Sequence, residues 1–301
     1  MDEQRDAPLW RFTTLKIGGE ATRLCQPGTI EELAALMADL RARDEPWFVL
    51  GGGSNLLVSS AGVEGTVIRT AQLTNMITPE AGLVQADAGA RLPHLARFAA
   101  SHGLSGLEFS VGIPGTVGGG VIMNAGAHGS CIANVLEDAT IYDAKTGEIK
   151  TLKKDEIGFE YRRCNLDPQV HVVLSARFRL QVQQREEIEA LTKHNEEYRW
   201  KTQPLGWPNA GSTFKNPEPN RTAGMLLDQS GAKNLREGAA AVSAVHANFV
   251  INMGGATSGE VVSLLRRMQD CVYNTFQVKL HPEWKTVGDF SDSERQVWRS
   301  T

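Results

Sequence analysis

Cysteine is scarce in this 301-residue chain, and none of the four cysteines lies near another. Cys25, Cys131, Cys164 and Cys271 form no C-x-x-C pair, which argues against a zinc ribbon, a thioredoxin-type dithiol and a disulfide framework. We therefore expect free thiols. The seven histidines form no H-E-x-x-H or similar pair either, so local sequence predicts no metal site.

Long apolar runs are also missing. No segment approaches the roughly 18 unbroken apolar residues of a membrane span, and the first residues, MDEQRDAPLW, lack the apolar stretch of a secretory signal. Neither sign of charge dominates: 31 Lys and Arg against 35 Asp and Glu disfavour a nucleic-acid surface. We expect a cytoplasmic globular protein of about two domains, or three small ones, without membrane insertion.

Glycine is abundant, and its placement is uneven. Of the 30 glycines, three are consecutive at 51–53 and nine more lie between residues 103 and 129. Glycine has no Cβ, so clusters of it mark places where the backbone needs unusual conformations or comes close to something else. Two separate segments of this chain meet that description.

Apolar periodicity and capping signals predict the surrounding elements. The capping box Thr29 to Glu32 begins a predicted helix that ends near Arg43, and strands at 47–50 and 66–68 complete a β-α-β unit. Further strands are predicted at 83–86, 139–142, 148–152 and 170–178, with a hairpin turn at 143–147 and helices at 92–101, 185–200, 223–230 and from a second capping box at Thr257. Short strands are expected around Ala240 and Phe249.

The first glycine segment, LGGGSNLLV at 50–58, follows the predicted strand 47–50 directly. Consecutive N–H groups in such a loop are able to converge on an anion. The segment is not G-x-G-x-x-G, because Leu56 occupies the last position, and no G-K-[ST] occurs anywhere in the chain. Its local pattern fits a phosphate-binding loop and an ordinary tight turn equally well.

The second glycine segment is SVGIPGTVGGGVIMNAGAHG at 110–129. It predicts a turn at 112–116 that leads into a helix, with Gly118, Gly119 and Gly120 at points where side chains would obstruct a large flat or phosphate-bearing ligand. Each glycine inside an element costs about 0.5–1 kcal/mol relative to alanine, so their number calls for a reason. The two segments together favour a dinucleotide ligand.

These motifs also carry a resemblance. LGGGSNLL, GIPGTVGG and MNAGAHG resemble the flavin-binding half of the family that includes p-cresol methylhydroxylase and vanillyl-alcohol oxidase. The chain is more closely similar to the UDP-N-acetylenolpyruvoylglucosamine reductase family, which it resembles in the same order at FEYRRC (159–164), NAGSTFKNP (209–217), AGMLLDQSGAK (223–233), VSAVHANFVIN (242–252) and VKLHPEWKTVG (278–288).

The resemblance implies an α+β fold with bound FAD. It implies two FAD-binding lobes, 1–70 and 71–185, and a C-terminal substrate-binding domain, 186–301. The residues implied to bind the cofactor are Leu50, Gly51, Gly52, Gly53, Ser54, Asn55, Leu56, Ser110, Val111, Gly112, Ile113, Pro114, Thr116, Gly118, Gly119, Asn124 and Ala125.

The resemblance also implies a reaction, in which NADPH reduces FAD and reduced FAD then converts UDP-N-acetylglucosamine enolpyruvate to UDP-N-acetylmuramate, a peptidoglycan precursor. Hydride goes to C3 of the enolpyruvyl group. In the family's motifs Arg162 stabilises the substrate carboxylate, Ser212 protonates C2 and Glu283 completes the polarising arrangement. The implied substrate-binding residues are Tyr161, Lys215, Asn216 and Gln229.

The chain departs from the family pattern in several places. Cys164 stands where Ser is common and Asn234 where Gly is common, and the short segment 178–203 leaves no room for the insert of longer members. His246 fits a ligand contact or a structural histidine. Two other functions remain open, an FAD-dependent oxidase on the same scaffold and a flavin- or nucleotide-binding protein without catalysis. Ser212 in its motif argues against the oxidase.

Overall fold

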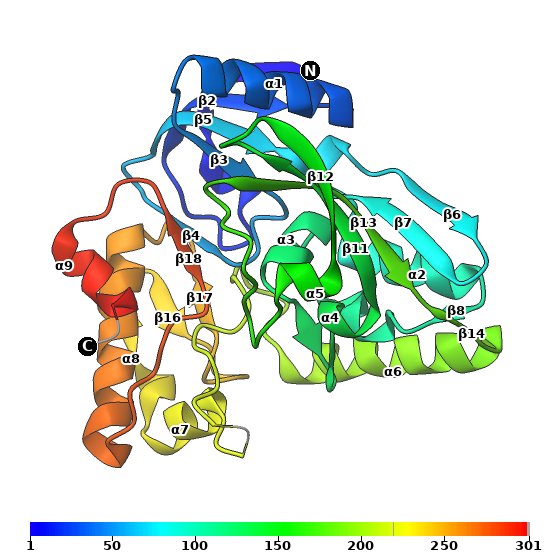
Figure 1. The fold of residues 1–301 in the computed structure, drawn as a ribbon. Coiled ribbons are helices and arrows are strands. Elements are labelled where there is room, and N and C mark those ends of the chain that lie inside the picture. Colours follow the sequence, from blue (N-terminus) through cyan, green and yellow to red (C-terminus); the bar gives the residue numbers. More distant parts are fainter. Residues whose placement is uncertain (219, 300–301) are drawn as a thin grey trace. The chain divides into compact units, whose positions relative to one another are not determined.

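The computed structural model describes residues 1–218 and 220–299 and mixes helices with strands along the whole chain (Figure 1). The helices are α1 (Ile30–Ala42), α2 (Leu92–Ser101), α3 (Val117–Ile122), α4 (Ile132–Val135), α5 (Lys154–Ile157), α6 (Arg185–Thr202), α7 (Ala223–Gln229), α8 (Ser258–Phe276) and α9 (Asp292–Arg295). In the part of the chain so described, no helix combines the length and apolar character needed to cross a membrane.

The strands form several small sheets. They are β1 (Asp2–Pro8), β2 (Glu20–Gln26), β3 (Trp47–Leu50), β4 (Leu56–Val58), β5 (Val63–Arg69), β6 (Met76–Glu80), β7 (Leu83–Asp87), β8 (Leu104–Ser105), β9 (Gly126–Ala127), β10 (Ser130–Cys131), β11 (Leu136–Asp143), β12 (Glu148–Lys153), β13 (His171–Arg179), β14 (Gln181–Val182), β15 (Arg236–Glu237), β16 (Ala240–Val242), β17 (Val250–Asn252) and β18 (Lys285–Val287).

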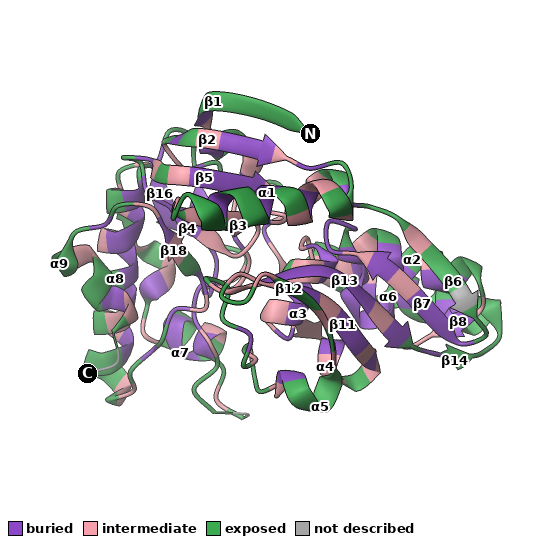
Figure 2. Cartoon of the chain, turned by 45° about the horizontal axis from the view of Figure 1, so that its top comes forward, coloured by how far each residue is buried: buried purple, intermediate pink, exposed green. Residues whose placement is uncertain are grey.

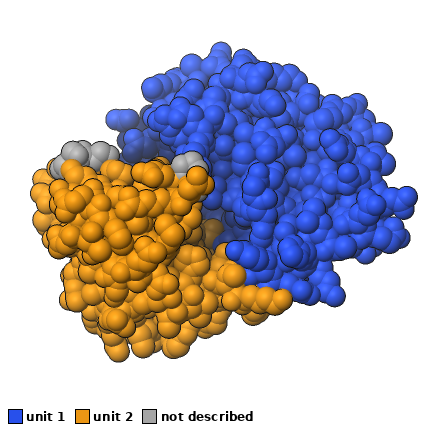
Figure 3. All heavy atoms as spheres, turned by 90° about the horizontal axis from the view of Figure 1, so that it is seen from below, with its two compact units in different colours: residues 1–5, 23–52, 65–199 blue, residues 6–22, 53–64, 200–301 orange. Residues whose placement is uncertain are grey.

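Contacts divide the chain into two compact units, drawn in different colours in Figure 3. Unit 1 consists of residues 1–5, 23–52 and 65–199, and unit 2 of residues 6–22, 53–64 and 200–301. The three predicted ranges 1–70, 71–185 and 186–301 do not coincide with these units, and they stay a prediction. The unit boundaries fall inside β1, β2, β5 and α6, and between the second and third glycine of the first glycine segment.

The largest sheet of unit 1 has the strand order β12-β11-β13-β7-β6, with every neighbouring pair antiparallel. The predicted hairpin turn at 143–147 joins β11 to β12. Helices α2 and α3 lie against this sheet's core, and α3 packs on β13. Alternating apolar residues of the strands therefore meet the apolar face of α2, which has the bounds predicted from its periodicity.

A second sheet has the order β1-β2-β5-β3, in which β3 and β5 are parallel, as expected for the ends of a crossover unit. Helix α1 begins at Thr29, whose hydroxyl accepts a hydrogen bond from the Glu32 N–H. Its buried residues, Leu33, Leu36, Met37 and Leu40, join a separate apolar cluster with residues of β5 and β13. The predicted helix and both predicted strands are therefore present, but α1 precedes β3 and β5 and does not connect them; the chain between these two strands contains β4 instead.

Unit 2 is built around α8, which covers the three-stranded sheet β15-β16-β17. Thr257 and Glu260 form the predicted capping box, and buried and exposed residues alternate along the helix (Figure 2). Leu15, Ile17 and Leu57 from the N-terminal segments of unit 2 join the same core, together with the fully buried Trp284. Parallel pairing of β18 with β4 completes this unit.

A charged side chain is buried in the large sheet of unit 1. Asp138 on β11 is 1% exposed and accepts hydrogen bonds from Arg177 Nε (2.8 Å) and Nη2 (2.5 Å) on β13 and from Lys153 Nζ (3.3 Å) on β12. The hydrogen bonds from Arg177 are the main reason why the pKa of Asp138 lies below its usual value. Asp138, Arg177 and Lys153 therefore link three neighbouring strands.

Replacing Asp138 with Asn removes this charge, and we expect the free energy of unfolding at pH 7 to fall by about 1–2 kcal/mol, since Arg177 is partly solvated. Because folding lowers the pKa of Asp138, the stabilisation is complete above the usual aspartate pKa and is lost as the pH falls through the folded-state value. Urea unfolding at neutral and acid pH measures both effects, with the exposed Asp155→Asn as control. A difference that does not narrow in acid would contradict this account.

Candidate active site

The two glycine segments touch each other within unit 1. A Cβ at Gly51 would lie 2.5 Å from Thr116 Oγ1, and one at Gly52 would lie 2.8 Å from the Pro114 carbonyl oxygen. Real Cβ atoms do not approach other atoms this closely, so only glycine permits the two loops to pack main chain against main chain. The end of β3 is thereby fixed against the turn that precedes α3.

Polar side chains of the second segment form hydrogen bonds with other groups of the protein. The Ser110 hydroxyl is buried and donates to the Leu107 carbonyl oxygen at 2.8 Å. Thr116 is the N-cap of α3, and its hydroxyl accepts from the Gly119 N–H at 3.5 Å. These side chains shape the loop, and the cofactor contacts predicted for Ser110 and Thr116 stay a prediction.

The three consecutive glycines of α3 have different surroundings. A Cβ at Gly118 would meet Ala88 at 3.1 Å, and one at Gly120 would meet Leu92 at 3.2 Å. Only at Gly119 is the space open, apart from Thr116 Oγ1 at 3.6 Å. At Gly118 and Gly120 the missing side chain therefore makes room for the protein's own core, and the predicted cofactor contacts of Gly118 and Gly119 stay a prediction.

Asn124 connects the second segment to the predicted catalytic arginine. Its side-chain Nδ2 donates to the Glu160 carbonyl oxygen at 2.9 Å, and its Oδ1 accepts from the Ala133 N–H at 3.0 Å. The carboxamide is buried and engaged at both ends, and the cofactor contact predicted for Asn124 also stays a prediction. Its position instead fixes the chain just before Tyr161 and Arg162.

Arg162 is held in a defined orientation in unit 1. Its Nη2 donates to the Gly126 carbonyl oxygen at 2.8 Å, and its guanidinium lies 5.2 Å from the ring centroid of Tyr161. The φ of Arg162 is 58°, a conformation that a residue with a side chain adopts only when its surroundings demand it. Tyr161 itself is 55% exposed.

The thiol of Cys164 takes part in a hydrogen bond within unit 1. Its Sγ donates to the Ile122 carbonyl oxygen at 3.4 Å, and burial raises the pKa of this thiol. The residue that replaces the family's usual Ser is therefore a neutral, partly buried group that contacts the end of α3.

Ser212 and Glu283 lie on neighbouring extended segments of unit 2. The Glu283 N–H donates to the Thr213 carbonyl oxygen at 2.8 Å, and the Lys215 N–H donates to the His281 carbonyl oxygen at 2.9 Å. Phe214 and Pro282 form an antiparallel bridge between these two bonds. We call residues 212–215 with 281–283 the catalytic ladder. It brings two predicted catalytic residues together across about 70 residues of sequence, whereas Arg162 belongs to unit 1.

The rest of the first glycine segment lies beside the catalytic ladder in unit 2. Asn55 Nδ2 donates to the Glu283 carbonyl oxygen at 3.4 Å, and the Lys285 N–H donates to the Asn55 carbonyl oxygen at 3.0 Å. A Cβ at Gly211 would lie 3.9 Å from the Ser54 carbonyl oxygen. The residues Ser54 and Asn55 are therefore in contact with the chain around both Ser212 and Glu283.

The predicted substrate-binding residues are spread over unit 2 and unit 1. Asn216 Oδ1 accepts from the Ala223 N–H at the start of α7, at 3.1 Å, and Gln229 is the exposed last residue of that helix. Lys215 is half-buried on the catalytic ladder. Tyr161 belongs to unit 1.

Four basic residues near these segments were not predicted from the sequence. Burial lowers the pKa of Lys285, and the charge of Lys215 lowers it further, so these two ammonium groups are neighbours. Arg69 lies opposite Leu50 in the β3–β5 register, and Arg91 bridges to Thr116. Burial lowers the pKa of Arg69, and the charge of Arg91 lowers it further. Arg199 of α6 donates to the Gly112 carbonyl oxygen. No local pattern separates these cations from ordinary surface charge.

His246 has a structural role in the described structure. Its Nδ1 accepts from the Asn248 N–H at 3.1 Å, and its ring meets that of Phe249 edge-on at 4.9 Å between centroids. Burial is the first cause of its lowered pKa, and the charge of Lys233 adds to it. The ring is therefore a neutral acceptor at this nitrogen.

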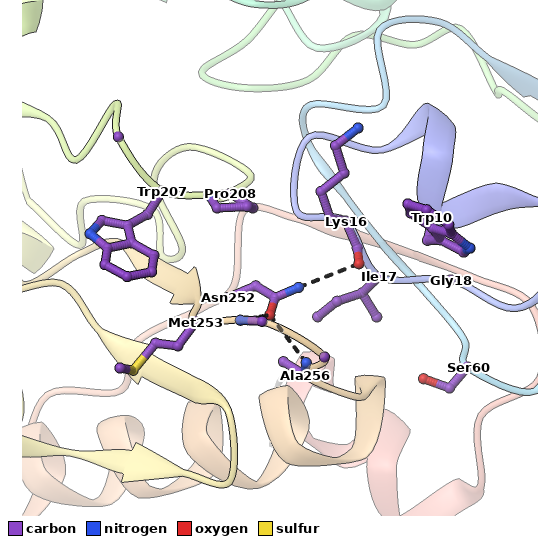
Figure 4. Close-up of a pocket in the computed structure, with 13 residues that line it drawn as sticks. Trp10, Lys16, Ile17, Gly18, Ser60, Trp207, Pro208, Asn252, Met253 and Ala256 are labelled. Carbon is purple, nitrogen blue, oxygen red and sulfur yellow. Dashed lines mark hydrogen bonds between the residues drawn. The ribbon is translucent and has the colours of Figure 1, made fainter.

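A separate open pocket of about 630 Å³ lies in unit 2 (Figure 4). Trp10 and Trp207 stand on opposite sides of it, and Asn252 lies between them. None of the residues that line it is among the predicted site residues. Among the residues that the structure describes, no group of three His, Cys, Asp or Glu side chains is arranged to hold a metal ion.

Comparison with known proteins identifies the family. Residues 21–153 match the family model of an FAD binding domain, and residues 203–287 match that of the UDP-N-acetylenolpyruvoylglucosamine reductase C-terminal domain. A UDP-N-acetylenolpyruvoylglucosamine reductase from Synechococcus sp. (strain RCC307) is 44% identical over 97% of this chain and 96% of its own. The chain belongs to the UDP-N-acetylenolpyruvoylglucosamine reductase family.

Other relatives agree with this assignment. The reductase of the same name from Caldicellulosiruptor saccharolyticus is 41% identical over 95% of this chain and 92% of its own. The crystal structure of UDP-N-acetylenolpyruvylglucosamine reductase (MurB) from Thermus caldophilus matches with a TM-score of 0.81 and 36% identity, covering 95% of this chain and 98% of that one. The predicted α+β fold class and family resemblance are confirmed.

The glycine segments suit an FAD in chemistry as well as in shape. Residues 50–56 and 110–125 contain no charged side chain, so no carboxylate opposes a pyrophosphate there. The open space at Gly119 leaves room for a ligand beside α3, and the guanidinium groups of Arg69 and Arg91 supply positive charge next to the loops in unit 1. Arginine and free main-chain N–H groups are the donors that phosphate oxygens prefer.

Replacing Gly52 with Ala forces the two loops apart, because the new Cβ would lie 2.8 Å from the Pro114 carbonyl oxygen. We expect FAD to bind about tenfold more weakly, because a tenfold change in affinity corresponds to the free-energy cost of mild overpacking. The ratio of flavin to protein absorbance and an FAD titration measure the effect. Gly206→Ala is the control, because a Cβ there meets nothing within 4 Å; equal FAD affinity in the two variants would refute the role of loop packing.

Proposed function

We propose that the chain is a cytoplasmic, NADPH-dependent FAD enzyme that reduces UDP-N-acetylglucosamine enolpyruvate to UDP-N-acetylmuramate, an early step of peptidoglycan synthesis. Family membership over nearly the whole chain supports this activity. The observation that carries the roles of individual residues is the catalytic ladder, which holds Ser212 and Glu283 on adjacent segments next to Ser54 and Asn55.

The substrate's chemistry defines what the protein must supply. FAD, when bound, supplies the carrier that takes hydride from NADPH and passes it on. Addition of hydride at the terminal carbon of an enolpyruvyl ether leaves negative charge spread over C2 and the carboxylate. A cation at the carboxylate and a proton donor at C2 are therefore the two groups that lower the barrier.

Arg162 binds the carboxylate in this scheme. A guanidinium offers paired donors that match the two carboxylate oxygens, and its charge is worth most as the negative charge grows. The hydrogen bond from its Nη2 to the Gly126 carbonyl oxygen restricts rotation of the guanidinium. The group is therefore already oriented before the substrate binds.

Ser212 donates the proton to C2. A hydroxyl is a very weak acid, so it serves only a strongly basic carbanion, which is what hydride addition creates here. Glu283, on the adjoining segment, polarises this region and completes the arrangement. Tyr161, Lys215, Asn216 and Gln229 bind the nucleotide sugar, for which the ammonium and amide donors suit a diphosphate and sugar hydroxyls.

The activity is tested by an anaerobic spectrum. The protein, loaded with FAD, is reduced with NADPH and then mixed with UDP-N-acetylglucosamine enolpyruvate. Rapid return of the oxidised flavin bands supports the proposal. Flavin that stays reduced until air is admitted would support the oxidase instead, and failure to bind any FAD would overturn both.

Replacing Ser212 with Ala separates the two half-reactions. We expect NADPH to reduce the flavin at an unchanged rate, while reoxidation by the enol ether slows by about 10²–10⁴-fold, since only the second step needs the proton at C2. Stopped-flow absorbance measures each step. Ser230→Ala, which removes a hydroxyl bound to the Leu227 carbonyl oxygen of the same unit, is the control. An equal loss of both steps in the Ser212 variant would exclude its role as proton donor.

A further inference from the structure

Asn248 lies in the loop between β16 and β17 of unit 2, and its side chain faces the catalytic ladder. It is 3% exposed, which is unusual for a polar residue unless its hydrogen bonds are made within the protein. The carboxamide has one acceptor and one donor end, and both meet the same residue. This contact is the starting point of the inference.

Asn248 pairs with the ladder as a short strand would. Its Oδ1 accepts from the Phe214 N–H at 2.9 Å, and its Nδ2 donates to the Phe214 carbonyl oxygen at 2.8 Å. Its own carbonyl oxygen accepts from the Thr213 N–H at 2.8 Å. Three hydrogen bonds from Asn248 therefore hold the two residues that follow Ser212.

The opposite edge of the same segment carries Glu283. Thr213 receives the Asn248 bond at its N–H and offers its carbonyl oxygen to the Glu283 N–H. The main chain after Ser212 is thus held between Asn248 on one side and the Glu283 segment on the other. Loss of the Asn248 side chain would remove both hydrogen bonds to Phe214 and leave Thr213 held by its main-chain bonds and by the Val250 N–H, which donates to its hydroxyl at 3.3 Å.

Asn248 is itself fixed in place. Its N–H donates to His246 Nδ1 at 3.1 Å, and the His246 ring packs against Phe249 and against Gly224 of α7. Gly224 has no Cβ, and one would come within 2.8 Å of this ring. The position of Asn248 is therefore determined by α7 and by the loop, independently of the catalytic ladder.

We propose that Asn248 is a positioning residue, which sets the place of the Ser212 hydroxyl relative to Glu283 for the protonation step. This inference rests on the proposed function, because it assigns Asn248 a role through Ser212. It differs from ordinary structural support in one respect. Loss of the Asn248 side-chain hydrogen bonds to Phe214 slows reoxidation of the flavin by the enol ether, which needs Ser212, more than reduction of the flavin by NADPH, which does not. A displacement of about 1 Å in a reacting group is enough to cost about 10²-fold in rate.

The test replaces Asn248 with Asp. The variant keeps the shape and the acceptor for the Phe214 N–H, but it removes the donor and sets a second oxygen against the Phe214 carbonyl oxygen. We expect flavin reduction by NADPH to keep its rate, and reoxidation by UDP-N-acetylglucosamine enolpyruvate to slow by about 10- to 100-fold. We also expect a larger solvent deuterium isotope effect on reoxidation, because proton transfer becomes the slow step.

Asn252→Asp is the matched control. Asn252 is equally buried in the same unit, with Nδ2 donating to the carbonyl oxygens of Leu15 (3.0 Å) and Lys16 (3.3 Å), and Oδ1 accepting from the N–H groups of Gly254 and Ala256 (Figure 4). Its side chain makes no hydrogen bond to the catalytic ladder among the described residues. Urea unfolding of both variants compares their loss of stability, and we expect the control to retain the reoxidation rate.

The outcomes are distinguishable. Equal slowing of reoxidation in the two variants, or equal slowing of both half-reactions in Asn248→Asp, would overturn the positioning role. If wild-type reduced flavin is not reoxidised by the enol ether, the proposed function fails instead. Should Asn248→Asp fail to fold, Asn248→Ser removes both side-chain hydrogen bonds to Phe214 without adding a charge. We expect the same selective slowing of reoxidation in that variant.

Discussion

The close approach of two main-chain segments is the constraint on which the candidate site depends. Gly51 and Gly52 pack directly on Pro114, Gly115 and Thr116, at distances that leave no space for a methyl group. This contact brings the end of β3 to the turn that precedes α3. Most polar side chains of the second segment are then committed to holding that geometry, as Ser110 and Thr116 illustrate.

Three asparagines play a common role around the predicted catalytic residues. Asn124 donates to the carbonyl oxygen of Glu160, two residues before Arg162; Asn55 donates to that of Glu283; and Asn248 binds both main-chain groups of Phe214, two residues after Ser212. An asparagine side chain carries the same donor and acceptor as a peptide group, so it extends a strand where no strand is present. Each predicted catalytic residue therefore has main-chain support from a carboxamide.

Much of the fold was predictable from local patterns. Helices with a clear N-cap and an apolar stripe, such as α1 and α8, and strands that end at a glycine segment, such as β3, have nearly the expected bounds. Several strands were not predicted, and β1 and β18 are examples. β1 has five exposed residues in succession, and β18 becomes a strand through its pairing with β4 more than 200 residues away.

The site was predictable as a set of motifs but not as an arrangement. The pairing of residues 212–215 with 281–283 depends on contacts that no local periodicity encodes. A sequence also does not reveal which end of a side chain is already engaged, so Asn55 and Asn124 resemble ligand contacts while their amide groups bind the protein. The same limit explains Gly118 and Gly120, whose missing side chains serve the core.

The division of unit 2 among three stretches of sequence has a consequence for how the chain folds during synthesis. Leu15, Ile17 and Leu57 leave the ribosome early, yet their core partners on α7 and α8 follow only after residue 222. Such a core has high contact order, so its apolar N-terminal residues stay uncovered until most of the chain has been translated. A fragment that begins at residue 200 would likewise lack part of its own core. Expressing the matched C-terminal domain alone would therefore leave apolar core residues uncovered and favour aggregation.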